Sequence, residues 1–516
     1  MKHFFLPFLL WSIMLFNPCY SNEFRNTIPN FRPVQTEPNK NPKGQGKQLE
    51  RLDVIEDVKL LQTLLKNYHP GLYTYISPIK LDNNFASLIS NLPEYPTEGY
   101  LQRELALLLG QIKCGHTYLN PWNANEDVFN RIYDDQIYFP LLFEVVENQL
   151  IVTENLSDDQ GIKKGAKIHA INGHKTQEII EKIKQVIKGD GFAADDHRLS
   201  ELGLDQVELN DRDWFDMYFH LFFPITEGNF SVEYQNFKSR KRKLAHVKAM
   251  TRSDRANKAS IKVGTRPKFW KRKTFKTVEY LHVSDFAIWN WDFDYKVFLK
   301  NFFGELQEQG VNQLIIDLRG NSGGLPEVAN ELLSYLSDKP IACPPDILNT
   351  TVYNGAKEEH KEVLFTGEPL LKEELPENIL KPIGENRFQV MIPDVGCTVI
   401  APKPNGFTGE VILLIDGRNA SAGFQFAQKF RFNKLGTIIG TKTGGNTMGI
   451  NGSKYFFAKL PKTGFEIDIP LIRQQFFLNA KDETIIPDIP IKNKQVNLAK
   501  GQDAILTKAL EFLERR

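Results

Sequence analysis

Two segments of the chain end a buried strand in residues that could carry out covalent chemistry. The apolar run Val411–Ile415 leads through a polar turn into the sequence NASAG, which contains Ser421. A serine at such a strand–helix turn projects its hydroxyl outward, and the N–H of Ala422 falls where a helix N-terminus can stabilise a negative oxygen. The spacing fits a nucleophilic serine beside an oxyanion site, but a serine that only caps the helix fits this segment equally well.

The second segment is LIIDLRGNSGG, residues Leu314–Gly324, in which an apolar strand runs into a polar turn rich in glycine. Glycines there let the backbone approach a ligand closely and turn its N–H groups towards it. A phosphate-binding loop has the same general form. This segment, however, lacks the lysine and spacing of a P-loop and the spacing of a dinucleotide fingerprint.

Alternating strands and helices from Val278 onward position both segments. Strands are predicted at 278–283, 313–318, 411–415 and 437–440, and a helix at 294–308. This alternation indicates a mixed α/β core over residues 275–500. Before it, apolar residues at three- and four-residue steps predict helices at 50–65 and 98–112, within an N-terminal helical subdomain over residues 48–125.

Residues 136–255 form a third unit. YFPLLFEVV, a polar turn and LIVT predict paired strands, and GIKKGAKIHAINGH followed by a helix near 177–187 resembles a PDZ domain. That resemblance implies peptide binding by strand addition. Tyr138–Leu141 replaces the loop that normally holds a terminal carboxylate, so a structural or gating role fits equally well. The basic run over residues 238–273 has two interpretations, a solvated connection or a surface for an acidic partner.

The N-terminus predicts export. A short basic start, the apolar run Phe4–Phe16 and the small residue Ser21 have the layout of a signal peptide over residues 1–21, followed by a polar linker over residues 22–47. A lipoprotein anchor at Cys19 would need small residues before it, and Asn17 and Pro18 stand there. No later stretch reaches the length of a membrane span. We therefore expect a periplasmic or extracellular protein.

Charge and cysteine content argue against other classes. Lys plus Arg total 64 and Asp plus Glu total 63, so the chain as a whole gives no reason to expect a nucleic-acid partner. Cys114, Cys343 and Cys397 would remain after cleavage at unrelated spacings, which form neither a disulfide framework nor a metal-ligand pattern. At most one pair could form, and we predict no metal and no cofactor.

Together the motifs resemble the tail-specific, or C-terminal-processing, serine peptidases. Leu314–Gly324 is similar to the family's Asp-Leu-Arg-Gly-Asn motif, Asn419–Gly423 to its nucleophile turn, Gly440–Gly445 to its glycine–threonine loop and Ile485–Ile489 to its closing strand. The resemblance implies a ClpP/crotonase-like mixed α/β peptidase core with a PDZ-like insertion, hydrolysis of peptide bonds, and Ser421 as nucleophile.

The same resemblance assigns the residues around Ser421. It implies an oxyanion hole formed by the N–H of Ala422 and a glycine N–H, with Gly323 preferred over Gly324. We assign Asn321 and Asn446 to substrate binding.

The base that activates Ser421 differs from the lysine used in part of the family. Asn446 stands where that lysine would be, and Lys442 lies four residues too early. The tricorn-like branch takes a histidine from the N-terminal helical unit, and His116 in the run Gly-His-Thr matches it. An imidazole acts as a general base near neutral pH without a large pKa shift.

The acid that would orient the second imidazole nitrogen is Asp482 or Glu483. Tricorn-like enzymes also carry a serine just before the histidine, and Gly115 replaces it here.

The sequence therefore predicts an exported serine peptidase that acts on proteins or peptides. The alternative is an inactive homologue that binds peptides through the cleft and the PDZ-like unit, although such a scaffold needs neither the serine turn nor His116. An acyl-CoA enzyme with the same core would have no reason for export or for the inserted unit.

Overall fold

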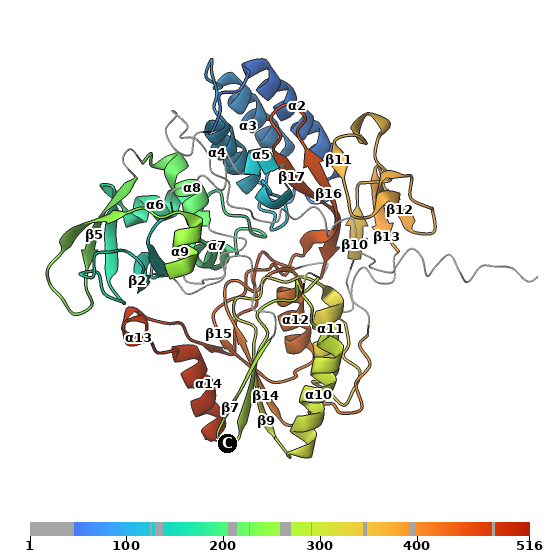
Figure 1. Cartoon of the computed structure of the whole chain (residues 1–516). Helices are drawn as coiled ribbons and strands as arrows, with labels where there is room; N and C mark the ends of the chain where they lie inside the picture. Colours follow the sequence, from blue (N-terminus) through green and yellow to red (C-terminus); the bar gives the residue numbers. More distant parts are fainter. Residues whose placement is uncertain are drawn as a thin grey trace, which may run out of the picture.

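The computed structural model describes residues 46–123, 126–129, 138–204, 214–225, 228–258, 270–289, 291–343, 348–391, 399–476 and 480–515. The predicted signal peptide, most of the linker, and Cys397 lie outside these ranges. The described residues form three six-stranded sheets. Figure 1 shows the first sheet in an α/β region that contains the C-terminus, the second sheet beside the N-terminal helices, and the third sheet at the left of the view.

The first sheet has the strand order β18-β15-β14-β9-β8-β7 and is parallel except for the β7–β8 hairpin. Its strands are β7 (Lys271–Phe275), β8 (Val278–His282), β9 (Gln313–Asp317), β14 (Glu410–Ile415), β15 (Thr437–Gly440) and β18 (Ile489–Pro490). Alternate residues enter two cores: Leu314 and Ile316 pack on one face, and Ile315 packs on the other. Both faces are covered, which is why β9 and β14 read as continuous apolar runs.

Helices cover the two faces of this sheet unequally. One face carries α10 (Tyr295–Glu308), α11 (Pro326–Ser334) and α12 (Ser421–Phe432), and the other carries α14 (Ala504–Glu514). Asp294 caps α10 by accepting the N–H groups of Lys296 and Val297, as expected for an N-cap aspartate. The short helix α13 (Gln495–Lys500) precedes α14.

The second sheet packs against the N-terminal helices in one apolar cluster. Its strands, in the order β11-β16-β17-β10-β13-β12, are β10 (Leu348–Thr351), β11 (Leu364–Phe365), β12 (Leu380–Gly384), β13 (Arg387–Val390), β16 (Ile450–Lys459) and β17 (Glu466–Gln475). The helices are α2 (Arg51–Tyr68), α3 (Pro78–Ser90) and α4 (Glu98–Gly110). The shorter elements nearby are η2 (Pro121–Asn123), α5 (Glu126–Phe129), η4 (Glu358–His360) and η5 (Pro369–Lys372).

The third sheet is antiparallel, with the order β1-β2-β3-β5-β6 and β4 paired to β3. Its strands are β1 (Leu141–Val146), β2 (Gln149–Asn155), β3 (Lys167–Ile171), β4 (His174–Lys175), β5 (Asn229–Gln235) and β6 (Lys243–Lys248). The helices are α6 (Thr176–Ile183), α7 (Asp195–Leu202), α8 (Trp214–Phe222) and α9 (Arg252–Lys258). We call this region the β1–β6 unit, and its resemblance to a PDZ domain stays a prediction.

The predicted mixed α/β fold class is confirmed. The strands after Val278 lie within one residue of the predicted bounds, whereas the helix predicted to reach Ile112 ends at Gly110. Of the cysteines described, Cys114 is a free thiol and Cys343 is disulfide-bonded. Within the described ranges, no helix is long and apolar enough to cross a membrane, and no cluster of residues could hold a metal ion.

Candidate active site

Ser421 is the first residue of α12 and directly follows the turn at the end of β14. Its φ angle is +48°, a left-handed conformation that non-glycine residues adopt uncommonly and that recurs at functional turns. The side chain is half-buried. The N–H of Ala422 lies in the first turn of α12, where N–H groups have no partner further back in the helix. The turn therefore presents a hydroxyl beside a backbone donor, as a nucleophile turn must.

The glycine loop after β9 packs directly on this turn. A Cβ atom at Gly323 would lie 2.7 Å from the Cβ of Ser421 and 2.9 Å from the N of Ala422, so only glycine fits there. The N–H of Gly323 donates to Oδ1 of Asn321 at 2.9 Å. Its carbonyl accepts the N–H of Phe286 at 3.0 Å, which fixes the loop along the segment after β8.

Two buried asparagines tie the glycine loop to the serine turn. Asn321 is fully buried and donates from Nδ2 to the carbonyl of Val283 at 3.0 Å. Asn419, also fully buried, donates from Nδ2 to the carbonyl of Asn321 at 3.0 Å and accepts the N–H of Asp416 at 2.8 Å. The two motifs that the sequence singled out are therefore held as one unit. The assignment of Asn321 to substrate binding stays a prediction.

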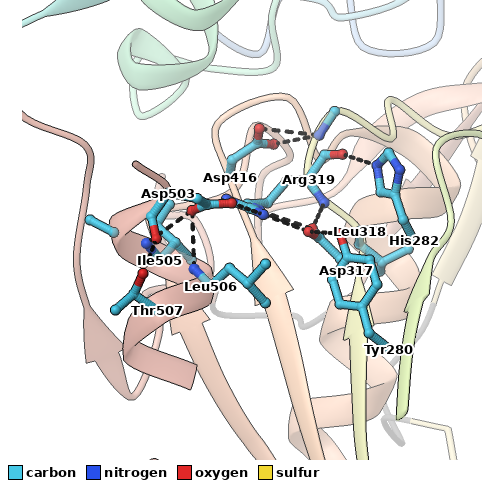
Figure 2. A network of polar contacts seen from close by, with 12 residues as sticks. Tyr280, His282, Asp317, Leu318, Arg319, Asp416, Asp503, Ile505, Leu506 and Thr507 are labelled. Atoms are coloured by element: carbon cyan, nitrogen blue, oxygen red, sulfur yellow. Dashed lines mark hydrogen bonds and ion pairs between the residues drawn. The ribbon is translucent and has the colours of Figure 1, made fainter. Parts of the chain in front are cut away.

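Arg319 anchors the base of the glycine loop to the C-terminal helix (Figure 2). Its guanidinium binds both carboxylate oxygens of Asp317 and both of Asp503, with the shortest contacts at 2.6 and 2.7 Å. Asp503 also caps α14. Beside this network, the N–H of Gly320 donates to the carboxylate of Asp416, which starts the serine turn.

His116 lies in a tight turn after α4. Lys113 in this turn has φ +58°, and the N–H of His116 contacts Sγ of Cys114 at 3.4 Å. The imidazole lies beside the ring of Tyr455, with 6.0 Å between the ring centroids. A Cβ atom at Gly452 would be 3.6 Å from its Cε1.

A bulge in β16 shapes the surface that meets the imidazole. The pairing of β16 with β17 shifts register between Gly452 and Tyr455, and Ser453 within the bulge has φ +77°. Bulges of this kind re-aim side chains and are frequent next to active sites.

The second sheet contacts both the helix that begins at Ser421 and the turn that carries His116. Gln425, one turn into α12, donates to Oε1 of Gln474 on β17 at 2.7 Å. Gln474 pairs with Ile450 on β16, two residues before the Gly452 position that borders His116. This chain of contacts places Ser421 and His116 on neighbouring elements.

The loop after β15 contains Asn446, at the position where part of the family has a lysine base, and the nearby Lys442. Asn446 is fully buried and donates from Nδ2 to the carbonyl of Asp190 at 3.1 Å and to Oδ1 of Asp482 at 2.5 Å. Lys442 is exposed. A lysine that acts as a base is ordinarily buried, and the Lys442 side chain is in solvent.

The two candidate acids face different surroundings. The carboxylate of Asp482 accepts the N–H groups of Phe192 at 3.0 Å and Ala193 at 3.2 Å. Glu483 has an exposed side chain, and its backbone carbonyl accepts the N–H of Thr447. Asp482 therefore points inward, to the β1–β6 unit.

Sequence reasoning missed Asp190, which lies between these parts. Its carboxylate accepts the N–H of Gly115 at 2.8 Å, immediately before His116. Burial raises the pKa of Asp190 to about 6. The available signal was an acid flanked by Gly189 and Gly191, a pattern in which the backbone can approach a neighbour closely.

Comparison with known proteins identifies the class. Residues 277–489 match the model of Peptidase family S41. No curated protein matches the sequence. The match agrees with the family that the sequence motifs resemble, and the prediction of a serine peptidase is confirmed.

Solved structures of CPAF share the fold over most of both chains. A CPAF mutant is 15% identical, covers 90% of this chain and 96% of its own, and has a TM-score of 0.62. Mature CPAF and its complex with lactacystin are both 14% identical with a TM-score of 0.60, and each covers 90% of this chain. They cover 96% and 97% of their own chains. At these identities the likeness shows a shared fold.

Proposed function

We propose that the chain is an exported peptidase that cleaves peptide bonds through an acyl-enzyme on Ser421, with His116 as general base. The observation that carries the proposal is the left-handed backbone conformation of Ser421 at the start of α12. This residue packs against Gly323, where a side chain would not fit. Both features support an oxyanion site formed by backbone N–H groups beside the Ser421 hydroxyl.

The chemistry follows in two balanced halves. His116 takes the proton of the Ser421 hydroxyl as the oxygen attacks the peptide carbonyl, and returns it to the leaving amine when the C–N bond breaks. A water molecule then gives a proton to His116 and attacks the acyl carbonyl. His116 returns that proton to the Ser421 oxygen as the acyl C–O bond breaks, which releases the new carboxyl terminus and restores the serine.

The oxyanion donors in this proposal are the N–H groups of Ala422 and Gly324. The N–H of Gly323 is committed to Asn321, and this bond supports Gly324 over Gly323 as the second donor. The role of Gly323 is then conformational, since its φ of +115° turns the loop.

The choice of base and acid rests on burial and position. Lys442 is exposed, whereas His116 packs against Tyr455 and Gly452. Asp482 is preferred over Glu483 as the acid that orients His116. Its carboxylate accepts the N–H of Phe192, in the same segment whose Asp190 accepts the N–H of Gly115 just before His116.

Export is supported by the disulfide at Cys343, since disulfides persist in oxidising compartments outside the cytoplasm. The predicted signal peptide at residues 1–21 agrees with this, and a periplasmic or extracellular location follows. For the β1–β6 unit we retain two roles, peptide binding by strand addition and gating of the site.

Hydrolysis of an unfolded protein such as casein tests the proposal. Residues 22–516 should cleave it, and Ser421→Ala and His116→Ala should each lower kcat/KM by about a thousandfold or more. Lys442→Ala serves as the matched control and should retain the wild-type rate. Tight peptide binding by the wild type without cleavage would instead establish the inactive binding homologue.

A further inference from the structure

The segment Asp190–Ala193 belongs to the β1–β6 unit but contacts the catalytic loops from both other regions. It lies between α6 and α7. On one side it binds the turn that carries His116, and on the other it binds Asn446 and Asp482.

Two hydrogen bonds hold the His116 turn to this segment. Oδ1 of Asp190 accepts the N–H of Gly115 at 2.8 Å, and the N–H of Gly191 donates to the carbonyl of Lys113 at 2.9 Å. Lys113 has φ +58°, a conformation that local sequence does not favour and that surrounding contacts must maintain. The segment therefore holds the turn from outside, in addition to the contact of the His116 N–H with Sγ of Cys114 within the turn.

The fit between the two segments is tight. A Cβ atom at Gly115 would lie 2.6 Å from Oδ2 of Asp190. A Cβ atom at Gly191 would lie 2.3 Å from Nδ2 of Asn446 and 2.4 Å from Oδ1 of Asp482. Small movements of the segment would therefore reach both loops.

Asp190 is a costly residue to place here. Its side chain is 3% exposed, and it forms no salt bridge with any described residue, although Arg198, Lys188 and Arg473 lie close enough to stabilise its charge. Burying a carboxylate without a direct ion pair is unfavourable unless strong hydrogen bonds offset it. The bond to the Gly115 N–H is the one that reaches the catalytic turn.

We propose that Asp190 is a positioning residue for catalysis: by accepting the Gly115 N–H it fixes the turn that aims the His116 imidazole at Ser421. The proposal rests on His116 as the general base. It makes the attack by Ser421 depend on a side chain of the β1–β6 unit, which lies outside the segment that matches the peptidase family.

The rate at which a fluorophosphonate labels Ser421 tests this role without a known substrate. Asp190→Ala should lower the rate constant by about tenfold or more, because small displacements of a catalytic group have large effects. Asp190→Asn keeps an oxygen acceptor for Gly115 and should stay within about threefold of wild type. The final labelled fraction should be unchanged in both, since a positioning defect slows every molecule instead of inactivating a few.

Asp57 provides the matched control. It is equally buried, at 1% exposed, and its carboxylate likewise accepts backbone N–H groups, from Lys462 and Thr463, in another part of the fold. Asp57→Ala should label at the wild-type rate. Equal slowing in Asp57→Ala, or an Asp190→Asn variant as slow as Asp190→Ala, would overturn the proposal.

His116→Ala, measured in parallel, separates the two hypotheses. If His116→Ala labels as fast as wild type, the assignment of the base has failed. If His116→Ala is slow and Asp190→Ala is not, only the positioning role of Asp190 has failed.

Discussion

Arg319→Met should lower the local free energy of unfolding at the end of the parallel sheet by more than the loss of an exposed ion pair would. The guanidinium joins Asp317 at the end of β9 to Asp503 at the start of α14 (Figure 2). Methionine keeps much of the side-chain volume and removes the charge and all donors. The substitution therefore tests the ion-pair network with little change in packing.

The burial of the two acids sets the expected size of the effect. The Asp317 side chain is 2% exposed, and without Arg319 its charge would retain only hydrogen bonds such as that from the Tyr280 hydroxyl. Leaving one partner of a buried pair alone costs about 3–5 kcal/mol. Asp503 is 38% exposed, so Asp503→Ala should cost only about 2 kcal/mol, from a screened ion pair and a lost helix cap.

Hydrogen exchange of the β9 and α14 amides measures these local free energies directly. Arg431→Met is the matched control, because Arg431 pairs with Asp488 at 3.2 Å on the surface, where both side chains are exposed. We expect less than about 1 kcal/mol for that variant. A loss in Arg319→Met no larger than in Arg431→Met would refute the reasoning.

Three further changes have defined outcomes. Burial raises the pKa of Glu466 from 4.5 to about 8, so the folded state holds this proton more tightly than the unfolded state and the free energy of unfolding falls as pH rises from about 4.5 to 8. One pKa unit is about 1.4 kcal/mol, so the free energy of unfolding falls by at most about 5 kcal/mol over this pH range. Glu466→Gln should therefore flatten the fall in Tm between pH 5 and 8. A Tm that falls as steeply in the variant as in the wild type would contradict this prediction. Asn321→Ala removes the acceptor of the Gly323 N–H and should lower kcat by about 10- to 100-fold with little change in KM. An unchanged kcat would show that this hydrogen bond does not hold the glycine loop in its catalytic conformation. Burial raises the pKa of Cys114 to about 12, so its thiol should resist iodoacetamide at pH 8 in the folded protein and react on unfolding; rapid alkylation of the native protein would disprove its burial.

The α/β core could be predicted from the sequence because its strands are buried on both faces. β9 and β14 are continuous apolar runs, and each ends in a polar turn with glycine or small residues. The local sequence therefore predicted both the strands and the turns that carry the candidate catalytic residues. The order of the two motifs along the chain then indicated the resemblance to a peptidase family.

The arrangement around His116 could not be predicted, because long-range contacts decide it. Asp57 on α2 binds the backbone of Lys462 and Thr463, about four hundred residues later, and this helps to join the N-terminal helices to the second sheet. Asp190 and Gly115 are 75 residues apart. Hydrophobic periodicity reports which face of an element is buried but not which element covers it.

The burial of Asn321 and Asn446 also lay beyond the sequence. Polar residues in glycine-rich loops are usually exposed, and an amide in such a loop is equally suited to bind substrate or to bind backbone. Only the three-dimensional contacts show that both amides are fully buried and bonded to neighbouring loops.

Mapping a fluorophosphonate adduct by mass spectrometry tests the central claim most directly. At neutral pH, residues 22–516 should carry one adduct, on Ser421. The adduct should be absent in Ser421→Ala, form slowly in His116→Ala and form normally in Lys442→Ala. No adduct on the wild type, or an adduct on Ser322 of the neighbouring glycine loop, would contradict the assignment of Ser421 as the nucleophile.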